Sequence, residues 1–524
     1  MATEALELVQ SRHRGPRWTV WLACVGTFML ILDVTVVNVA LPDMERSLHA
    51  QLTDLEWVVD AYSLAIAALL LVSGRLSDLI GRKRTFIAGL FVFTAGSLWS
   101  SLSGSVVELI AGRVVQGAGG AALFASALAV VGHEPEGPER RRALGAWGAA
   151  IGAGLAVGPL VGGLLTDGFG WSAIFLVNVP IGVVMLVASW RRMPESARSA
   201  IAPPDWVGST VFALALFLLV FGLVEGNRLG WSSAVIVGSL VVSLSLLALF
   251  MRLSRREGAI LDTALLGDPR FLASTIAVIG QGVVIAAVLL YLVRDLQETG
   301  HLSPLAAGLE ILPMTVTAFG AAILGGRFAA SRKPAFLLAG SLLLLAGGTA
   351  LMTISNPAGG WATLLPGLFL AGAGWGSVNP IAAHASLEAA GPENVGMAAG
   401  FNNTARQIGI AGGIGGLGAA FQARTASVTT AALHGVTPVL AGHLGQAVAL
   451  SGAAGSTGAL APRLRSELVH ASAQGMTSGL HLVELLGAGA GLVSAVLVLA
   501  AGSGAGARAL DRRRAGRRLA EPAR

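Results

Sequence analysis

The chain has 524 residues, of which 54% are hydrophobic and only 12% are charged. Soluble domains carry roughly 25% charged residues, so this composition excludes a surface that faces water and requires lipid as the solvent. The net charge of +6 therefore matters by its location along the chain and does not indicate nucleic-acid binding. The single cysteine excludes an intramolecular disulfide and a cysteine-based metal cluster. We expect no metal and no cofactor.

Apolar runs of membrane-spanning length follow one another along the chain. A helix needs about 20 predominantly apolar residues to cross the hydrocarbon layer of a bilayer. The sequence contains fourteen such runs and therefore predicts an all-α polytopic membrane protein with 14 transmembrane helices. The runs begin near Trp18, Leu55, Thr85, Glu108, Ala143, Ser172, Trp206, Ser233, Phe271, Leu305, Ala335, Trp361, Met397 and Leu480.

The basic residues favour one orientation. With the amino terminus in the cytoplasm, most of the 35 lysines and arginines fall in cytoplasmic segments. This asymmetry is the positive-inside pattern, and it predicts that both termini are cytoplasmic. The arginine-rich carboxyl-terminal tail is expected to bind lipid headgroups.

One motif occurs twice. Gly74-Arg75-Leu76 precedes Arg82-Lys83, and Gly326-Arg327-Phe328 precedes Arg332-Lys333. Related halves around a central site are common in secondary transporters. We therefore expect a cytoplasmic amino terminus (1–17), a six-helix half (18–190), a linker with inserted helices 7 and 8 (191–253), a second six-helix half (254–502) and a basic tail (503–524). Residues 425–476 are too weakly apolar to span, and are predicted to form an extracytoplasmic surface loop that could be helical in part.

Ionisable residues inside the membrane call for a partner or a function. Each costs at least ~2.5 to 3.5 kcal/mol at the bilayer centre on insertion scales. Asp33, Asp60 and Arg113 are predicted at one depth, so an Asp/Arg pair could form. Such a carboxylate is either part of a static ion pair or a proton carrier. Thr35 and Asn38 point about 140 to 200° away from Asp33 and are expected to hydrogen-bond a neighbouring helix.

The thirteenth run carries a second polar cluster. Its members share one helical face, which should line a cavity or the interface between the halves: Asn402, Asn403, Arg406 and Gln407.

Further ionisable residues lie nearer the ends of the spans. Glu225, Glu310, Glu388 and Glu484 are best explained by side chains that reach toward the headgroups. His384 is either a proton relay or a packed, hydrogen-bonded side chain.

Glycines recur in the fifth run. Gly154, Gly158 and Gly162 are spaced by four residues, with Pro159 and Gly163 beside them. This spacing predicts a groove where another helix approaches closely.

Five segments together resemble the fourteen-span drug/proton antiporters of the major facilitator superfamily. They are Leu32–Pro42, Gly74–Arg84, Arg113–Gly119, Gly154–Gly163 and Gly400–Gly409. The resemblance implies alternating access and export of amphiphilic, hydrophobic, cationic or aromatic compounds in exchange for protons. It implies that Asp33 carries the proton or the substrate charge and that Arg113 modulates the pKa of Asp33.

The resemblance also implies a cytoplasmic gate. Its residues would be Gly74, Arg75, Asp78, Gly81, Arg82 and Lys83. In the second half Ala330 occupies the position of Asp78 and the loop is shorter, so a weaker latch is expected there.

The expected partners are a small amphiphilic substrate, protons and membrane lipids, with no nucleic acid. We expect a monomer in a bacterial inner or plasma membrane. A proton-coupled uptake carrier for a small metabolite is the first alternative, and the span 5 glycines disfavour it. A polytopic membrane enzyme is the second, but the sequence contains no catalytic cluster that would support it.

Overall fold

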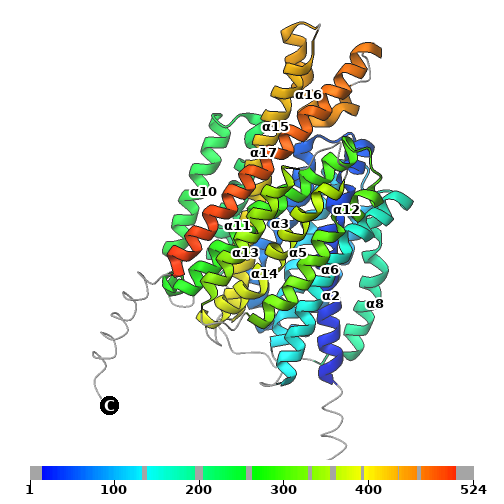
Figure 1. The fold of residues 1–524 in the computed structure, drawn as a ribbon. Helices are drawn as coiled ribbons and strands as arrows, with labels where there is room; N and C mark the ends of the chain where they lie inside the picture. The colour runs from blue at the N-terminus through cyan, green and yellow to red at the C-terminus, as the bar shows by residue number, and fades with distance from the viewer. Residues whose placement is uncertain are drawn as a thin grey trace, which may run out of the picture.

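The computed structural model describes residues 15–132, 138–194, 205–254, 256, 263–328, 333–354, 361–390, 395–434, 436–456 and 462–502. Within these ranges every regular element is helical, and the helices pack as one bundle (Figure 1). The predicted all-α fold is confirmed.

The first eight long helices follow the predicted runs. The first half comprises α2 (Gly15–Leu48), α3 (Leu52–Ile80), α4 (Arg82–Ser101), α5 (Val106–Gly132), α6 (Pro138–Phe169), and the short α7 (Ala173–Leu176) continuing into α8 (Asn178–Arg192). The inserted pair is α9 (Trp206–Leu229) and α10 (Ala234–Leu253).

The second half begins with a short 3-10 turn. Its elements are η1 (Thr263–Gly267), α11 (Pro269–Glu298), α12 (Pro304–Phe328), α13 (Pro334–Met352), η3 (Trp361–Leu364), α14 (Leu365–Ala390), α15 (Val395–Ala432), α16 (Pro438–Ser456) and α17 (Pro462–Gly502). Each of the fourteen predicted runs thus corresponds to a helical segment, with α7 and α8 together forming the sixth. Ten helices in the described ranges are long and apolar enough to cross a membrane by length and composition alone.

The stretch 425–476 is more helical than the sequence suggests. Helix α15 continues to Ala432, α16 follows, and α17 begins at Pro462, well before the predicted start near Leu480. These segments form the part that projects at the top of Figure 1. They have a small core of their own, made of Leu433, Ala441, Leu444, Val448, Leu468 and Ala471. Small residues permit this packing, since a Cβ on Gly475 would lie 2.8 Å from the backbone oxygen of Thr425.

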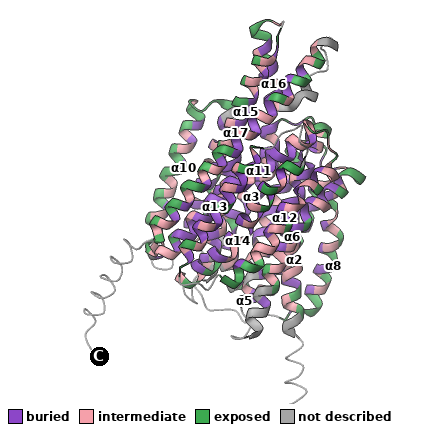
Figure 2. Ribbon diagram, viewed as in Figure 1, coloured by how far each residue is buried: buried purple, intermediate pink, exposed green. Residues whose placement is uncertain are grey.

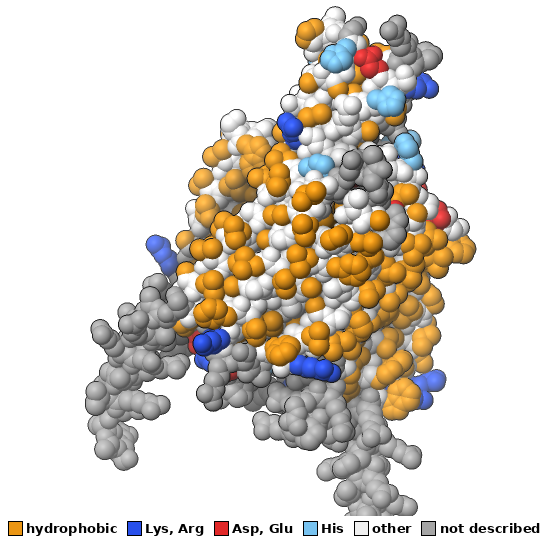
Figure 3. Space-filling model, viewed as in Figure 1, with side chains coloured by type: hydrophobic (Ala, Val, Ile, Leu, Met, Phe, Trp, Pro, Cys, Tyr) orange, Lys and Arg blue, Asp and Glu red, His pale blue; other side chains and the backbone are white. Residues whose placement is uncertain are grey.

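The outer surface of the bundle is apolar, while polar side chains are buried inside it. Phe91, Val184, Trp190 and Leu244 are strongly exposed, although Asp33 is fully buried. Exposed residues lie along the periphery (Figure 2), and hydrophobic side chains cover the middle of the visible face (Figure 3). This distribution is the reverse of that in a water-soluble domain and fits a protein surrounded by lipid.

The two halves meet along several helices. Helix α6 packs against α12, α3 packs against α15, and α2 contacts α11. Inserted helix α9 packs against both α3 and α15 and so covers the seam between them. The indole N–H of Trp57 on α3 donates to the carboxylate of Glu225 on α9 at 2.8 Å, which fastens the inserted pair to the first half.

Candidate functional site

Asp33 on α2 lies at the centre of a buried hydrogen-bond network. Its side chain is fully buried, and its Oδ2 accepts from Nη1 of Arg113 on α5 at 2.6 Å. Its Oδ1 accepts from Nε2 of Gln116 at 2.8 Å and from Nδ2 of Asn178 at 2.9 Å. Three donors therefore share the charge of one carboxylate, which offsets the cost of burying it. The structure brings together the Asp/Arg pair that the sequence allows.

Arg113 is held from several sides. Its Nε donates to the carbonyl of Val58 on α3 at 3.2 Å. Its guanidinium carbon lies 4.0 Å from the ring centroid of Tyr62, a cation–π contact. Gly117 lets α5 approach α3 closely, since a Cβ there would lie 2.8 Å from the Cβ of Ala65. The arginine thus connects α2, α3 and α5 within the first half.

Two members of this network were missed from the sequence. Asn178 and Gln116 each donate to Oγ of Ser97 at 3.1 Å as well as to Asp33. Gln116 follows Arg113 by three residues, so its place on the same helical face was a readable signal. Asn178 is the first residue of α8, and no spacing in the sequence links it to Asp33 or Arg113.

Asp60 on α3 does not join the Arg113 pair. It is buried, and both of its carboxylate oxygens lack a hydrogen-bond partner among the described residues. Its neighbours on α3 contact the second half: Glu56 Oε1 accepts from the hydroxyl of Tyr291 at 3.0 Å, and the Ser63 carbonyl accepts from Gln407 at 3.2 Å. Glu56, Asp60 and Ser63 are spaced by four and three residues and so share one face of the helix. That face looks toward the second half.

The polar cluster on α15 lies in contacts between helices. Gln407 reaches the first half through Ser63, whereas Asn402 donates to Oγ of Ser274 on α11 at 3.4 Å. Arg406 donates to the side-chain oxygen of Asn403 on the same helix. None of these four lines the pocket described next, so the cavity-lining prediction is not met at this pocket. Gln407 fits the predicted interface between the halves.

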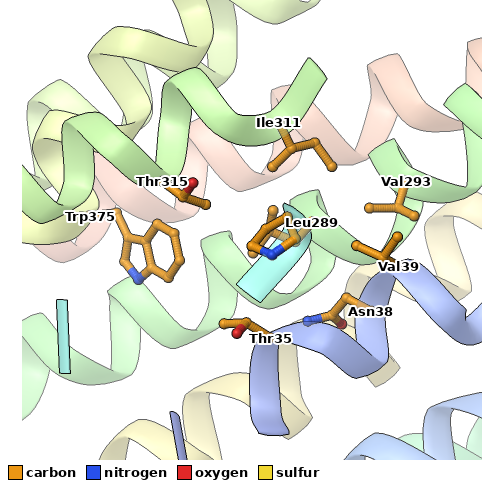
Figure 4. A pocket seen from close by; sticks show the side chains of 9 residues that line it. Thr35, Asn38, Val39, Leu289, Val293, Ile311, Thr315 and Trp375 are labelled. Carbon is orange, nitrogen blue, oxygen red and sulfur yellow. The ribbon is translucent and has the colours of Figure 1, made fainter. Parts of the chain in front are cut away.

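A small pocket with about 10 Å³ of free space lies between the halves (Figure 4). Five helices contribute to it: α2 and α6 from the first half, and α11, α12 and α14 from the second. It is lined by Thr35, Asn38, Val39, Pro159, Leu289, Val293, Ile311, Thr315 and Trp375.

Thr35 and Asn38 therefore have a position that the sequence reasoning did not assign. The single hydroxyl proton of Thr35 has acceptors on two helices: the Gly154 carbonyl on α6 at 3.2 Å, as expected for a bond to a neighbouring helix, and two carbonyls of its own helix at 3.0 and 3.1 Å. Asn38 Nδ2 donates to Val34 of its own helix at 3.3 Å, which corrects the expectation for this residue. Both also line the pocket, and no local pattern in the sequence marks that role.

The span 5 glycines bring α6 close to helices of both halves. A Cβ on Gly158 would overlap the hydroxyl of Thr35, and one on Gly162 would lie 2.9 Å from Cα of Val36, both on α2. Gly154 approaches α2 in the same way.

On the other side, a Cβ on Gly163 would lie 2.7 Å from Cα of Leu305 on α12. A Cβ on Gly308 of α12 would likewise overlap the carbonyl of Pro159. The predicted close helix approach is present, and it also joins the halves.

The predicted gate lies between α3 and α4. Gly81 has φ +103°, a conformation that favours glycine, and it makes the turn between the two helices. Gly74 has open space beside it, and Arg82 and Lys83 begin α4. The side chains of Arg75 and Asp78 lie outside the described residues, as does Ala330. The latch therefore stays a prediction.

A charged contact between the halves was missed altogether. Arg294 on α11 is buried and lies 3.1 Å from Glu45 on α2 and 2.8 Å from Glu298 on its own helix. In the predicted orientation Arg294 would lie at the outer end of α11, where a solvated charge is expected. Gln297, one turn further, donates to the Val39 carbonyl on α2 at 2.9 Å.

The remaining glutamates have different environments. Glu225 is buried and paired with Arg228 at 2.7 Å. Glu484 is fully buried with both oxygens unpartnered among the described residues. The prediction that these two reach toward headgroups is wrong, because helices cover them. Glu310 is partly buried, and one of its oxygens lacks a partner in the described ranges.

Glu388 and His384 lie together at the end of α14. The carboxylate of Glu388 is 3.2 Å from Arg270 on α11 and 3.8 Å from Nδ1 of His384, and both side chains are about half exposed. Burial raises the pKa of neighbouring Asp268, but hydrogen bonds and charge from Arg270 lower the pKa below its usual value overall. His384 therefore lies beside a half-exposed glutamate near the end of α14.

Residues 23–414 match the Major Facilitator Superfamily. The chain belongs to this superfamily. Its members are transporters, so the enzyme alternative is excluded.

Three members of the superfamily that are similar to this chain are resistance proteins. The methylenomycin A resistance protein of Streptomyces coelicolor is 35% identical over 75% of this chain and 83% of its own length. The tetracenomycin C resistance and export protein of Streptomyces glaucescens is 32% identical over 93% of this chain and 92% of its own length. The multidrug resistance protein Stp of Mycobacterium tuberculosis is 35% identical over 76% and 74%.

Among solved structures, a bacterial homologue of the human lysosomal transporter Spinster, inward-facing and unoccupied, has a TM-score of 0.59 at 14% identity. The match covers 93% of this chain and 98% of that one, and it supports the major facilitator fold.

Proposed function

We propose that this protein is a drug/proton antiporter that exports amphiphilic, hydrophobic or cationic compounds such as antibiotics by alternating access. Relatives aligned over most of the chain are resistance and export proteins, which supports export as the direction of transport. Entry of protons would supply the energy. Each charge crossing 100 mV yields ~2.3 kcal/mol, and each pH unit adds ~1.4 kcal/mol.

Asp60 carries the case for proton coupling. An ionised carboxylate buried without a partner costs several kcal/mol, whereas a protonated one costs much less. Asp60 is buried with both oxygens unpartnered among the described residues, on the face of α3 that meets the second half. Separation of the halves would give this carboxyl access to water, where it could release or take up a proton. In this proposal Asp60 carries the proton.

Asp33 and Arg113 have the complementary role. Their ion pair joins α2 to α5, and Arg113 also bonds to α3 two residues before Asp60. A change in the protonation of Asp60 would therefore affect the Asp33–Arg113 pair through α3. Asp33 lies two residues before Thr35, which lines the pocket. Static packing remains the alternative for this pair, and the variants below separate the two.

We propose that both termini face the cytoplasm of a bacterial cell and that the monomer is the transporting unit. Basic side chains gather at the lower end of the view in Figure 3, the predicted cytoplasmic end. Helices of both halves of one chain enclose the pocket.

The test is transport by the purified protein in proteoliposomes with an imposed pH gradient, using ethidium as the probe. We expect gradient-dependent accumulation by the wild type and none by Asp60→Asn. Asp167→Asn, an exposed carboxylate at the end of α6, is the matched control and should transport normally. Wild-type coupling in Asp60→Asn would overturn the assignment of Asp60. Transport that ignores the pH gradient in the wild type would overturn antiport.

The uptake carrier is tested by the same vesicles. Movement of the probe in the same direction as the protons would indicate symport. For the exporter we expect the probe and the protons to move in opposite directions.

A further inference from the structure

We propose that Glu56 on α3 delivers protons from the outer side of the membrane to Asp60, and that Tyr291 closes this route while the halves are in contact. The proposal rests on the proposed proton coupling and adds the path by which protons arrive. Glu56 is fully buried. Helix α3 begins at Leu52, at the end predicted to be extracytoplasmic, so Glu56 lies about one turn closer to the outside than Asp60.

The two carboxyl groups are neighbours on one face of α3. Residues four apart on a helix have Cβ atoms about 5–6 Å apart, so these carboxyl groups can be joined directly or through one water. The charge of Asp60 acts on Glu56 in this arrangement. Oε2 of Glu56 and both oxygens of Asp60 are buried without a hydrogen-bond partner in the described ranges. These three oxygens are therefore available to exchange a proton.

The delivery takes two proton transfers. Protonated Glu56 gives its proton to the ionised carboxylate of Asp60, which leaves Glu56 ionised and Asp60 neutral. Glu56 then takes a new proton from external water. The pair gains one proton in total, and water is the only other reactant.

Tyr291 covers Glu56 from the second half. The Tyr291 hydroxyl on α11 donates to Oε1 of Glu56 at 3.0 Å. Gly418 on α15 leaves room for this contact, since a Cβ there would lie 3.0 Å from Oε1 of Glu56 and would overlap the Tyr291 hydroxyl. One turn beyond Tyr291, Arg294 pairs with Glu45 of the first half. Because both contacts join the halves, their separation at the outer end would release Tyr291 and admit water to Glu56.

Charged side chains on the helices packed against α3 have other partners within the part of the chain that the structure describes. They are Glu225 on α9, bound by Trp57 and Arg228; Arg113 on α5, paired with Asp33; Arg294 on α11, paired with Glu45 and Glu298; and Arg406 on α15, bound to Asn403. Asp60 is therefore the acceptor that is available to a proton on Glu56.

Two measurements in proteoliposomes separate proton delivery from the conformational change. The protein molecules that accumulate ethidium in vesicles with an acidic lumen have their outer face toward the lumen, so this accumulation requires protons at that face. Exchange of ethidium at equal pH on both sides requires the conformational change but no net proton uptake. A group that only delivers protons should therefore affect the first measurement and not the second.

Glu56→Gln removes the titratable group but keeps an oxygen that can accept from Tyr291. We expect accumulation at least tenfold slower than in the wild type at a luminal pH of about 7, with exchange within about twofold. Acidifying both sides by one pH unit at a constant gradient should speed the variant at least fivefold, because Asp60 then takes protons directly from water. The wild type should change less than twofold. Glu56→Asp keeps a carboxyl group and should retain at least a third of the wild-type rate.

Two further variants complete the test. Glu108→Gln removes an exposed carboxylate near the outer end of α5 and is the matched control, with both rates expected at the wild-type level. Asp60→Asn should keep exchange but lose accumulation at every luminal pH, as expected for the group that carries the proton.

The outcomes distinguish this proposal from the proposed function. Wild-type accumulation in Glu56→Gln would refute delivery through Glu56 and leave antiport standing. A loss that acidification does not relieve would make Glu56 the carrier itself, and a loss of exchange as well would make its role structural, so either result overturns the proposal. A wild type that ignores the pH gradient would refute the proposed proton coupling.

Discussion

Arg294 and Glu45 form a buried ion pair of 3.1 Å that joins α11 of the second half to α2 of the first. The contact lies at the helix ends predicted to be extracytoplasmic. Arg294 also pairs with Glu298, but that bridge lies within α11 and does not cross between the halves. The two bridges therefore give a matched pair of substitutions, one across the interface and one beside it.

Glu45→Gln should favour opening at the outer end. It removes the counter-charge across the interface, and breaking a buried pair typically costs about 3–5 kcal/mol. The measurement is labelling of Val39→Cys by an externally added, impermeant maleimide in a Cys24→Ser background. We expect labelling at least tenfold faster in Glu45→Gln and little changed in Glu298→Gln. Equal acceleration in both variants would show that the inter-half pair does not hold this end closed.

Asp33→Asn should cost stability as well as transport. The substitution leaves Arg113 buried without its counter-charge, which predicts a loss of about 3–5 kcal/mol. Thermal unfolding of the purified protein measures it. The double variant Asp33→Asn/Arg113→Gln removes both charges and should recover much of the stability. If the double variant also regains proton-driven transport, the pair is only structural.

Gly158→Val should disrupt the contact between α6 and α2. The new side chain would overlap Thr35, whereas Gly148 on the same helix has open space beside it. Overpacking in a filled interior typically costs about 1–3 kcal/mol. We expect reduced thermal stability and reduced transport for Gly158→Val, with Gly148→Val close to wild type. A similar loss at both positions would point to helix propensity as the cause.

The helices and one central contact could be predicted from the sequence. Long apolar runs identify the spans because lipid requires them, and the cost of buried charge favours pairing of Asp33 with Arg113. The place of Asp60 could not be read in the same way. Val58 and Tyr62 face Arg113, and Asp60 lies two residues from each, about 200° around the helix. The predicted depth of Asp60 in the membrane does not show which side of α3 its side chain faces.

The pocket and the outer ion pair depend on contacts between the halves. The glycine-rich sequence around Trp375 indicates close helix packing and no binding role. The position of Trp375 at the pocket depends on which helices flank α14. Arg294 lies near a helix end, where a single sequence favours a solvated charge. Only the tertiary arrangement places Glu45 beside it.

The contact between Glu56 and Tyr291 can be tested by comparing the two tyrosines of the chain, which differ in whether the hydroxyl has a hydrogen-bond partner. The hydroxyl of Tyr291 donates to buried Glu56 at 3.0 Å across the halves, and its ring stacks on Phe421 with centroids 4.3 Å apart. The hydroxyl of Tyr62 is buried without a partner among the described residues, while its ring contacts Arg113.

Phenylalanine at either position keeps the ring contact and removes only the hydroxyl. Tyr291→Phe leaves a buried carboxylate oxygen unsatisfied and should lower the free energy of unfolding by about 1–3 kcal/mol. Tyr62→Phe breaks no hydrogen bond in the described structure and should be neutral or slightly stabilising. Denaturant unfolding in one detergent compares them directly. If Tyr291→Phe unfolds at the same denaturant concentration as the wild type, the Tyr291 hydroxyl does not stabilise the contact between the halves.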